Sequence, residues 1–119
     1  MKVLFDQNVP HKLRTTLERL TSRHEIFTAA YMGWSELANG ELLRTAEENG
    51  MELFVTGDGT LHYEQNLTGR RLSIVALSTD NWPILKNPIP KILAAIDSAL
   101  PGSFQAVECG RFNRNASRD

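Results

Sequence analysis

Short apolar runs bounded by polar residues divide the chain into alternating strands and helices. Four runs have the length and composition of strands: residues 2–5, 25–28, 53–56 and 72–77. The last of these is apolar at almost every position, a pattern that favours a parallel sheet covered on both faces. A weaker run at 103–107 predicts a fifth strand at one edge of the sheet.

Between these runs, apolar residues recur at spacings of three and four, which is the pattern of an amphipathic helix. Asn8 and Pro10 suit the start of the first helix, and Asn39 suits the N-cap of a second helix that Asn49-Gly50 ends. A last helix is expected from about residue 89 to residue 100. The three apolar stripes are Leu13, Leu17 and Leu20; Leu42, Leu43 and Ala46; and Ile89, Ile92, Leu93, Ile96 and Leu100.

Two further segments show no such period. Residues 29–38 are expected to form a loop, and residues 60–69 a polar connection with room for a short helix. Strands that alternate with helices predict βαβ units, so the expected fold class is α/β, with helices on both sides of a mainly parallel sheet. Residues 1–109 are read as one domain, and the polar, basic segment 110–119 as a flexible tail.

Charge, cysteine content and hydrophobic patterns limit the expected partners and the expected cellular location. The formal net charge of the 119 residues is -1, so a nucleic acid would be held by a local basic patch or a metal ion. Cys109 is the only cysteine, which excludes an intramolecular disulfide. No apolar run has the length of a membrane span and no signal-peptide pattern is present, so we expect a cytoplasmic protein with no membrane partner.

Three carboxylates stand out by their positions. Asp6 follows the first strand, Glu41 lies in the first turn of the second helix, and Asp58 follows the third strand. Each alone has a structural explanation, since aspartate favours turns and a helix start favours negative charge. Together they could meet at one edge of the sheet, where open α/β sheets bind ligands.

Carboxylates that meet at such an edge predict a site for Mg²⁺ or Mn²⁺, because these cations take oxygen ligands. A cation of this kind activates water and neutralises phosphate oxygens, which suits the hydrolysis of a phosphodiester. The three histidines are scattered along the sequence and do not indicate zinc. The patterns of serine hydrolases and P-loop NTPases are absent from the sequence.

Five segments in order resemble the DUF5615 family of PIN-like proteins, which is related to the Mut7-C and VapC-type PIN domains. The resemblance covers residues 2 to about 100, and the order and spacing of the segments carry it. They are Lys2-Val-Leu-Phe-Asp-Gln-Asn-Val-Pro10, Met32-Gly-Trp-Ser35, Asn39-Gly-Glu-Leu-Leu43, Phe54-Val-Thr-Gly-Asp58 and Tyr63-Glu-Gln-Asn66.

The resemblance implies a three-layer α/β/α sandwich and a ribonuclease that uses Mg²⁺ or Mn²⁺, often the toxin of a toxin–antitoxin pair. It also implies RNA as substrate, an antitoxin as partner and a homodimer. By motif match Asp6, Glu41 and Asp58 are its catalytic, metal-binding acids. Gln7 departs from the pattern, because many family members have Glu there. Only Glu64 and Asn66 are available where PIN nucleases have a further acid.

Other polar and aromatic residues are candidates for supporting roles. Asn8, Thr56 and Asn66 are candidates to support the acids, although Asn8 as a helix cap and Thr56 as a strand residue have structural explanations. Arg70 and Arg71 are candidates to bind RNA phosphates, with a solvated turn as the alternative. Tyr63 and Trp34 are candidates to stack on an unpaired base, although Trp34 also suits a gap in the core.

One alternative function remains open, and two others fit the sequence poorly. A catalytically weak or inactive PIN-like domain would bind RNA or a partner protein, and Gln7 favours this reading. A phosphoacceptor receiver domain has a similar length, but it needs an acidic pair after the first strand and a Lys after the fifth, and this chain has Asp6-Gln7 and no such Lys. A phosphatase of the Asp-x-Asp type would need an acid where Asn8 stands.

Overall fold

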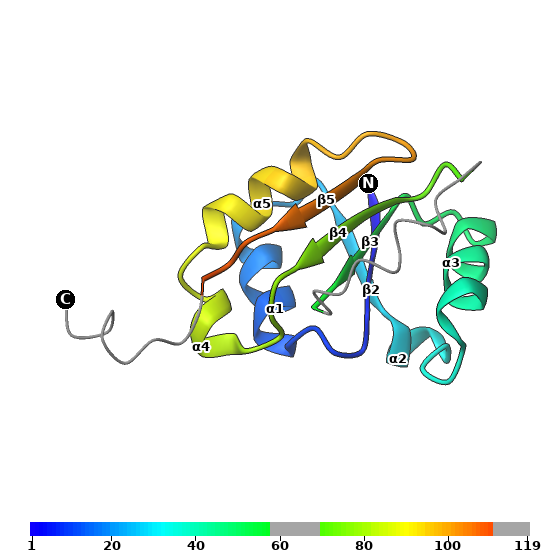
Figure 1. The fold of residues 1–119 in the computed structure, drawn as a ribbon, viewed down its shortest axis with the longest axis horizontal. Coiled ribbons are helices and arrows are strands. Elements are labelled where there is room, and N and C mark those ends of the chain that lie inside the picture. The colour runs from blue at the N-terminus through cyan, green and yellow to red at the C-terminus, as the bar shows by residue number, and fades with distance from the viewer. Residues whose placement is uncertain (58–69, 111–119) are drawn as a thin grey trace.

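A five-stranded parallel sheet forms the centre of the molecule, in the order β2-β1-β3-β4-β5. The structure is a computed structural model that describes residues 1–57 and 70–110. It confirms the predicted sheet and the fifth strand at its edge (Figure 1). The strands are β1 (Lys2–Phe5), β2 (Glu25–Thr28), β3 (Leu53–Thr56), β4 (Ser73–Leu77) and β5 (Phe104–Val107).

Helices cover both faces of this sheet. Helices α1, α4 and α5 lie on one face and α3 lies on the other, which confirms the expected α/β/α layers (Figure 1). No helix in the described ranges is both long and apolar enough to cross a membrane. The helices are α1 (His11–Leu20), α2 (Ala29–Met32), α3 (Asn39–Glu48), α4 (Trp82–Leu85) and α5 (Ile89–Asp97).

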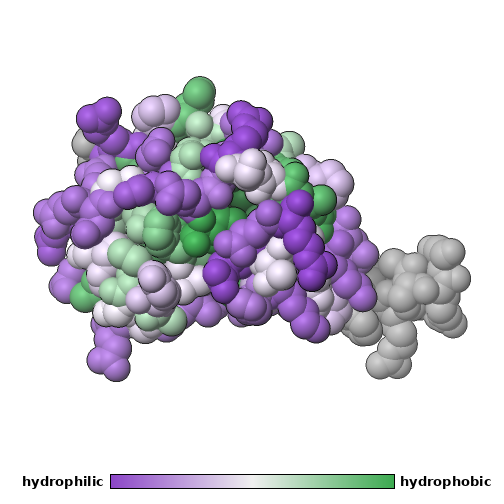
Figure 2. All heavy atoms as spheres, turned by 180° about the vertical axis from the view of Figure 1, so that it is seen from behind, coloured by the Kyte–Doolittle hydropathy of each residue, from purple (hydrophilic) through white to green (hydrophobic). Residues whose placement is uncertain are grey.

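Alternating strand residues supply two separate cores. Val3 and Phe5 of β1 pack with α1, α4 and α5, whereas Leu4 between them packs with α3. Because successive side chains of a strand point to opposite faces, a strand buried on both sides must be apolar at every position. Phe54 of β3 is also fully buried. At the surface, hydrophilic residues border a hydrophobic area in the centre of the face seen in Figure 2.

The helix boundaries correct several predictions. The segment expected to be a loop at 29–38 contains α2, in which the Thr28 hydroxyl accepts the Tyr31 N–H at 3.0 Å. The last helix ends at Asp97, three residues earlier than expected. Leu20 was placed on the apolar stripe of the first helix, but it is 57% exposed because α1 ends there.

The predicted N-caps were also wrong. α1 begins at His11 with Pro10 in the N-cap position, so Asn8 lies too far upstream to cap it. α3 begins at Asn39 itself, and Ala38 holds its N-cap position. Neither cap position makes a side-chain hydrogen bond. Pro10 and Ala38 are both extended, which is the backbone shape that an N-cap requires.

The last turn of α3 is attached to the start of β4. The Glu47 carboxylate accepts the N–H of Arg71 at 2.7 Å and that of Leu72 at 3.0 Å, and it pairs with Arg70 at 4.0 Å. These contacts hold the end of α3 at the edge where the strands begin, the amino edge. Its first turn therefore lies at the opposite edge, where the strands end, which we call the carboxyl edge (Figure 1).

This attachment should make stability depend on pH. The N–H of Leu72, with that of Arg71 and the charges of Arg70 and Arg71, lowers the pKa of Glu47 from 4.5. A lowered folded-state pKa stabilises the protein above the unfolded value, and this contribution is lost as the pH falls through the folded value. We expect Glu47→Gln to reduce the free energy of unfolding at pH 7 by about 1 kcal/mol, allowing for solvent exposure.

Urea unfolding of wild type and Glu47→Gln from pH 7 to below the lowered pKa would measure this difference. The two curves should converge at the acid end, because protonated Glu47 no longer carries the charge. Glu48→Gln is the matched control, since Glu48 is the exposed neighbour on the same helix. A difference that stays constant with pH would show that the carboxylate charge of Glu47 does not stabilise the fold.

Candidate functional site

The candidate site lies where β1 and β3 end, side by side in the middle of the sheet. The chain passes from β1 to β2 on one side and from β3 to β4 and β5 on the other. Such a reversal of direction is the position at which open parallel sheets bind ligands, at the carboxyl edge. Asp6 follows β1 and Gly57 follows β3, so the connectivity brings these two residues together.

Two neighbouring groups of the described chain orient the Asp6 carboxylate. The Thr56 hydroxyl donates to Asp6 Oδ2 at 2.9 Å, and the backbone N–H of Gln7 donates to Oδ1 at 2.8 Å. The backbone of Asp6 is fixed as well, because its N–H donates to the Val55 carbonyl at 2.9 Å and extends the β1–β3 pairing. The side chain is therefore oriented and half-buried.

Thr56 was a candidate to support the acids, and the structure identifies Asp6 as one residue that it contacts. Its side chain is fully buried and donates to Asp6. A residue with no exposed surface cannot contact a substrate. Thr56 therefore belongs to the support of Asp6, and its hydroxyl explains why a polar residue ends the otherwise apolar strand β3.

Asn8 joins the two strand ends instead of capping α1. Its side-chain oxygen accepts the N–H of Gly57 at 3.0 Å, across 49 positions of sequence. The bond holds the first residue after β3 in register with the turn after β1. Asp58 follows Gly57 directly in the sequence but lies outside the described residues, as do Tyr63 and Asn66.

Glu41 reaches the same edge from α3. It lies in the first turn of that helix and its side chain is exposed. The attachment of Glu47 at the amino edge places this first turn at the carboxyl edge, as Figure 1 shows. The predicted acids Asp6 and Glu41 are therefore on one edge. Gln7, which stands where the family often has Glu, is exposed.

Asp80 is an acid at this edge that the sequence interpretation missed. A Cβ added to Gly57 would lie 2.9 Å from the Asp80 Cβ and 3.1 Å from its Cα, so the two backbones almost touch. Asp80 follows β4, the neighbour of β3, and it is exposed. The signal was available, because Asp80 follows its strand as Asp6 and Asp58 follow theirs.

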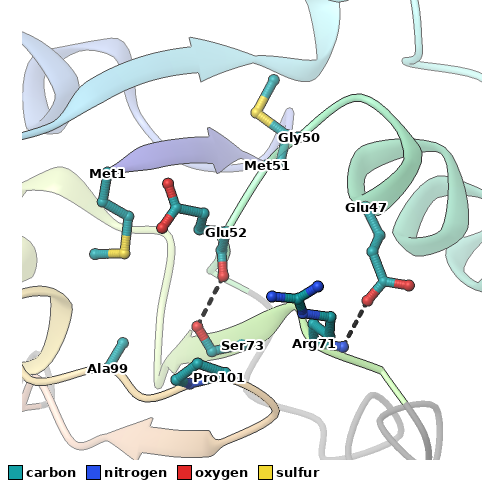
Figure 3. Close-up of a pocket in the computed structure, with 9 residues that line it drawn as sticks. All are labelled: Met1, Glu47, Gly50, Met51, Glu52, Arg71, Ser73, Ala99 and Pro101. Atoms are coloured by element: carbon teal, nitrogen blue, oxygen red, sulfur yellow. Dashed lines mark hydrogen bonds between the residues drawn. The ribbon is translucent and has the colours of Figure 1, made fainter.

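The arginine pair lies at the other edge of the sheet. Arg70 and Arg71 precede β4, and Arg71 lines a cavity of about 320 Å³ at the amino edge, together with Glu52 and Ser73 (Figure 3). They therefore do not share an edge with Asp6, contrary to the arrangement expected from the sequence. Residues before a strand and residues after it are separated by the length of that strand. Arg70 and Arg71, which precede β4, therefore lie away from the carboxyl edge.

Trp34 and the acids complete the placement of the predicted residues. Trp34 packs against the core on the α3 side, which agrees with its reading as a core residue. Within residues 1–57 and 70–110, no group of three His, Cys, Asp or Glu side chains is arranged to hold a metal ion. A metal site that includes Asp6 and Asp58 stays a prediction, because Asp58 lies outside the described residues.

Thr56→Val tests whether Thr56 positions Asp6. Valine matches threonine in shape but cannot donate, so the fold should survive with a loss of about 1 kcal/mol in unfolding free energy. If Asp6 holds Mn²⁺ as predicted from the sequence, the affinity for this ion, measured by titration calorimetry, should fall about 10- to 100-fold, as when other residues that orient metal ligands are changed. Thr56→Ser keeps the hydroxyl and should recover most of the affinity. Wild-type affinity in Thr56→Val would contradict the positioning role.

Comparisons with known proteins add no relative. No family model matches the chain, and neither the curated proteins nor the solved structures include a match. The geometry of the carboxyl edge and the sequence resemblance are therefore the support for a function.

Proposed function

We propose that this protein is a metal-dependent endoribonuclease that hydrolyses phosphodiester bonds of RNA at the carboxyl edge of its sheet. The observation that carries the proposal is the Asp6 carboxylate, oriented by Thr56 and by the Gln7 N–H where the sheet changes direction. Because the sequence resembles PIN-like proteins, we also propose that the protein is the toxin of a toxin–antitoxin pair.

The donor chemistry of this edge fits Mg²⁺ or Mn²⁺. Carboxylate oxygens are the ligands these ions prefer, and Asp6 and Asp80 follow β1 and β4, on either side of β3. Asp6, Asp58 and Glu41 would hold the ion, with Asp80 as a further acid. When bound, the ion would supply Lewis-acid chemistry for water activation and neutralise charge on the phosphate.

The residues of the chain have distinct roles in this proposal. Thr56 fixes the direction of one Asp6 oxygen, and the Gln7 N–H fixes the other. Asn8 holds Gly57, and through it the start of the segment that bears Asp58. A water that attacks the phosphorus in line with the leaving oxygen would give a 5′-phosphate and a 3′-hydroxyl. No nucleophile from the protein is then required.

Asp6→Asn tests the central acid. Purified wild-type protein should cleave single-stranded RNA with Mg²⁺ or Mn²⁺ and stop when EDTA is added. Asp6→Asn should lose about 100-fold or more in rate, because a charged ligand is replaced by a neutral one and several kcal/mol of charge stabilisation are lost. Glu48→Gln, an exposed acid change near the amino edge, should leave the rate unchanged. Full activity in Asp6→Asn would refute the assignment.

Asp80→Asn measures the contribution of the acid that the structure adds. If Asp80 shares the metal, the variant should need roughly 10-fold more Mn²⁺ for half-maximal activity, with little change in thermal stability because the side chain is exposed. A titration of activity against Mn²⁺ gives the value directly. An unchanged titration would leave Asp80 as a loop residue that only packs against Gly57.

A binding module without catalysis is the second candidate function. One observation favours it: Gln7 is exposed at a position where the family that the sequence resembles often has an acid. Calorimetry with Mn²⁺ separates the two functions. A nuclease should bind Mn²⁺ through Asp6, with a heat of binding that Asp6→Asn removes. A binding module should bind RNA and show no such Mn²⁺ heat.

A further inference from the structure

A groove beside the edge strand β2 opens next to the candidate site. Its volume is about 250 Å³, and Arg14, Ile26, Phe27, Thr28 and Tyr31 line it. Thr28 is the last residue of β2 and pairs with Phe5, the residue immediately before Asp6. Neighbouring strands lie about 4.8 Å apart, so one end of the groove is about one strand spacing from β1.

Arg14 brings a fixed positive charge to the groove. Its Nη2 lies 3.1 Å from His11 Nδ1, and its Nη1 lies 3.8 Å from Glu18 Oε2. The Nε atom is buried and has no hydrogen-bond partner among residues 1–57 and 70–110, while 29% of the side chain stays exposed. A planar guanidinium held in this way can bind phosphate oxygens through paired N–H groups. Arg14 is also one turn from the start of α1. Because α1 follows the end of β1, this turn lies near the carboxyl edge.

Tyr31 places an aromatic ring at the same groove. Tyr31 as a whole is 81% exposed, the highest value among the large hydrophobic residues that the structure describes. It stands on the short helix α2, which the Thr28 hydroxyl caps at one end and Gly33 closes at the other with a left-handed backbone (φ 78°). Such a ring contributes little to the core. It is exposed, and its backbone is held in place by α2, as stacking on a nucleobase requires.

We propose that this groove binds one nucleotide of single-stranded RNA next to the bond that is cut. Tyr31 stacks on the base, Ile26 and Phe27 contact its edge, and Arg14 binds the adjoining phosphate. The choice of RNA as the ligand rests on the proposed function. The pairing of one cation with one exposed ring favours a nucleotide over a peptide, which would need a longer apolar surface.

The test measures binding without cleavage. A labelled single-stranded oligoribonucleotide is titrated into wild type in EDTA, and into the Asp6→Asn background with Mg²⁺. Arg14→Gln should weaken binding about 5- to 10-fold and lower the salt dependence by about one ion. Tyr31→Ala should weaken binding about 5- to 100-fold, and Tyr31→Phe, which keeps the ring, should bind like its parent.

Matched variants control for charge, surface and folding. Arg19→Gln removes an exposed arginine from the last turn of α1, and Leu100→Ala removes a side chain that is 69% exposed outside the groove. Both should bind like their parent, and thermal melts confirm that every variant is folded. The proposal is overturned if Arg14→Gln and Tyr31→Ala bind like these controls, or if neither parent protein binds the RNA.

Cleavage assays on the same proteins separate this proposal from the proposed function. If the groove variants lose binding while wild type cuts no RNA, the groove stands and the nuclease assignment fails. If wild type cuts RNA and the groove variants bind and cut like the controls, the nuclease assignment stands and the groove proposal fails.

Discussion

The pairing of β1 with β3 in the middle of the sheet is the constraint on which the candidate site depends. These strands are separated by more than 45 residues in sequence, yet Val3, Leu4 and Phe5 pair directly with Leu53, Phe54 and Val55. All six side chains are buried, so a shift in register by one residue would exchange the two apolar faces. The register therefore fixes where each strand ends, and with it the contact between Asp6 and Thr56.

Contacts at the amino edge also help to build the carboxyl edge. Glu47 ties the last turn of α3 to the first residues of β4, and the buried face of α3 packs over Leu4 and Phe54. A helix that is fixed at one end and along one face has little freedom to slide. The position of Glu41 in its first turn thus depends on a carboxylate at the opposite end of the same helix.

The sequence predicted the fold better than the site. Continuous apolar runs and the 3.6-residue period report burial directly, and they located the five strands and the three longer helices α1, α3 and α5. Asn8 was read as a helix cap because local rules cannot show that its oxygen accepts the distant Gly57 N–H. Arg70 and Arg71 were read as candidates to bind RNA phosphates near the acids, whereas their place before β4 in a parallel sheet assigns them to the other edge.

In the proposed function, charge explains why an acidic edge would need both a cation and a separate basic groove to hold RNA. Asp6, Glu41 and Asp80 all lie at the carboxyl edge, and their negative charges repel a phosphate. The net charge of -1 gives no global attraction to offset this repulsion. A divalent ion among the acids would reverse the local sign, and Arg14, in the groove beside β2, adds a positive charge that does not depend on the ion. In the proposed function, phosphate would therefore be favoured at the boundary between these two positive centres, which is where the bond to be cut would lie.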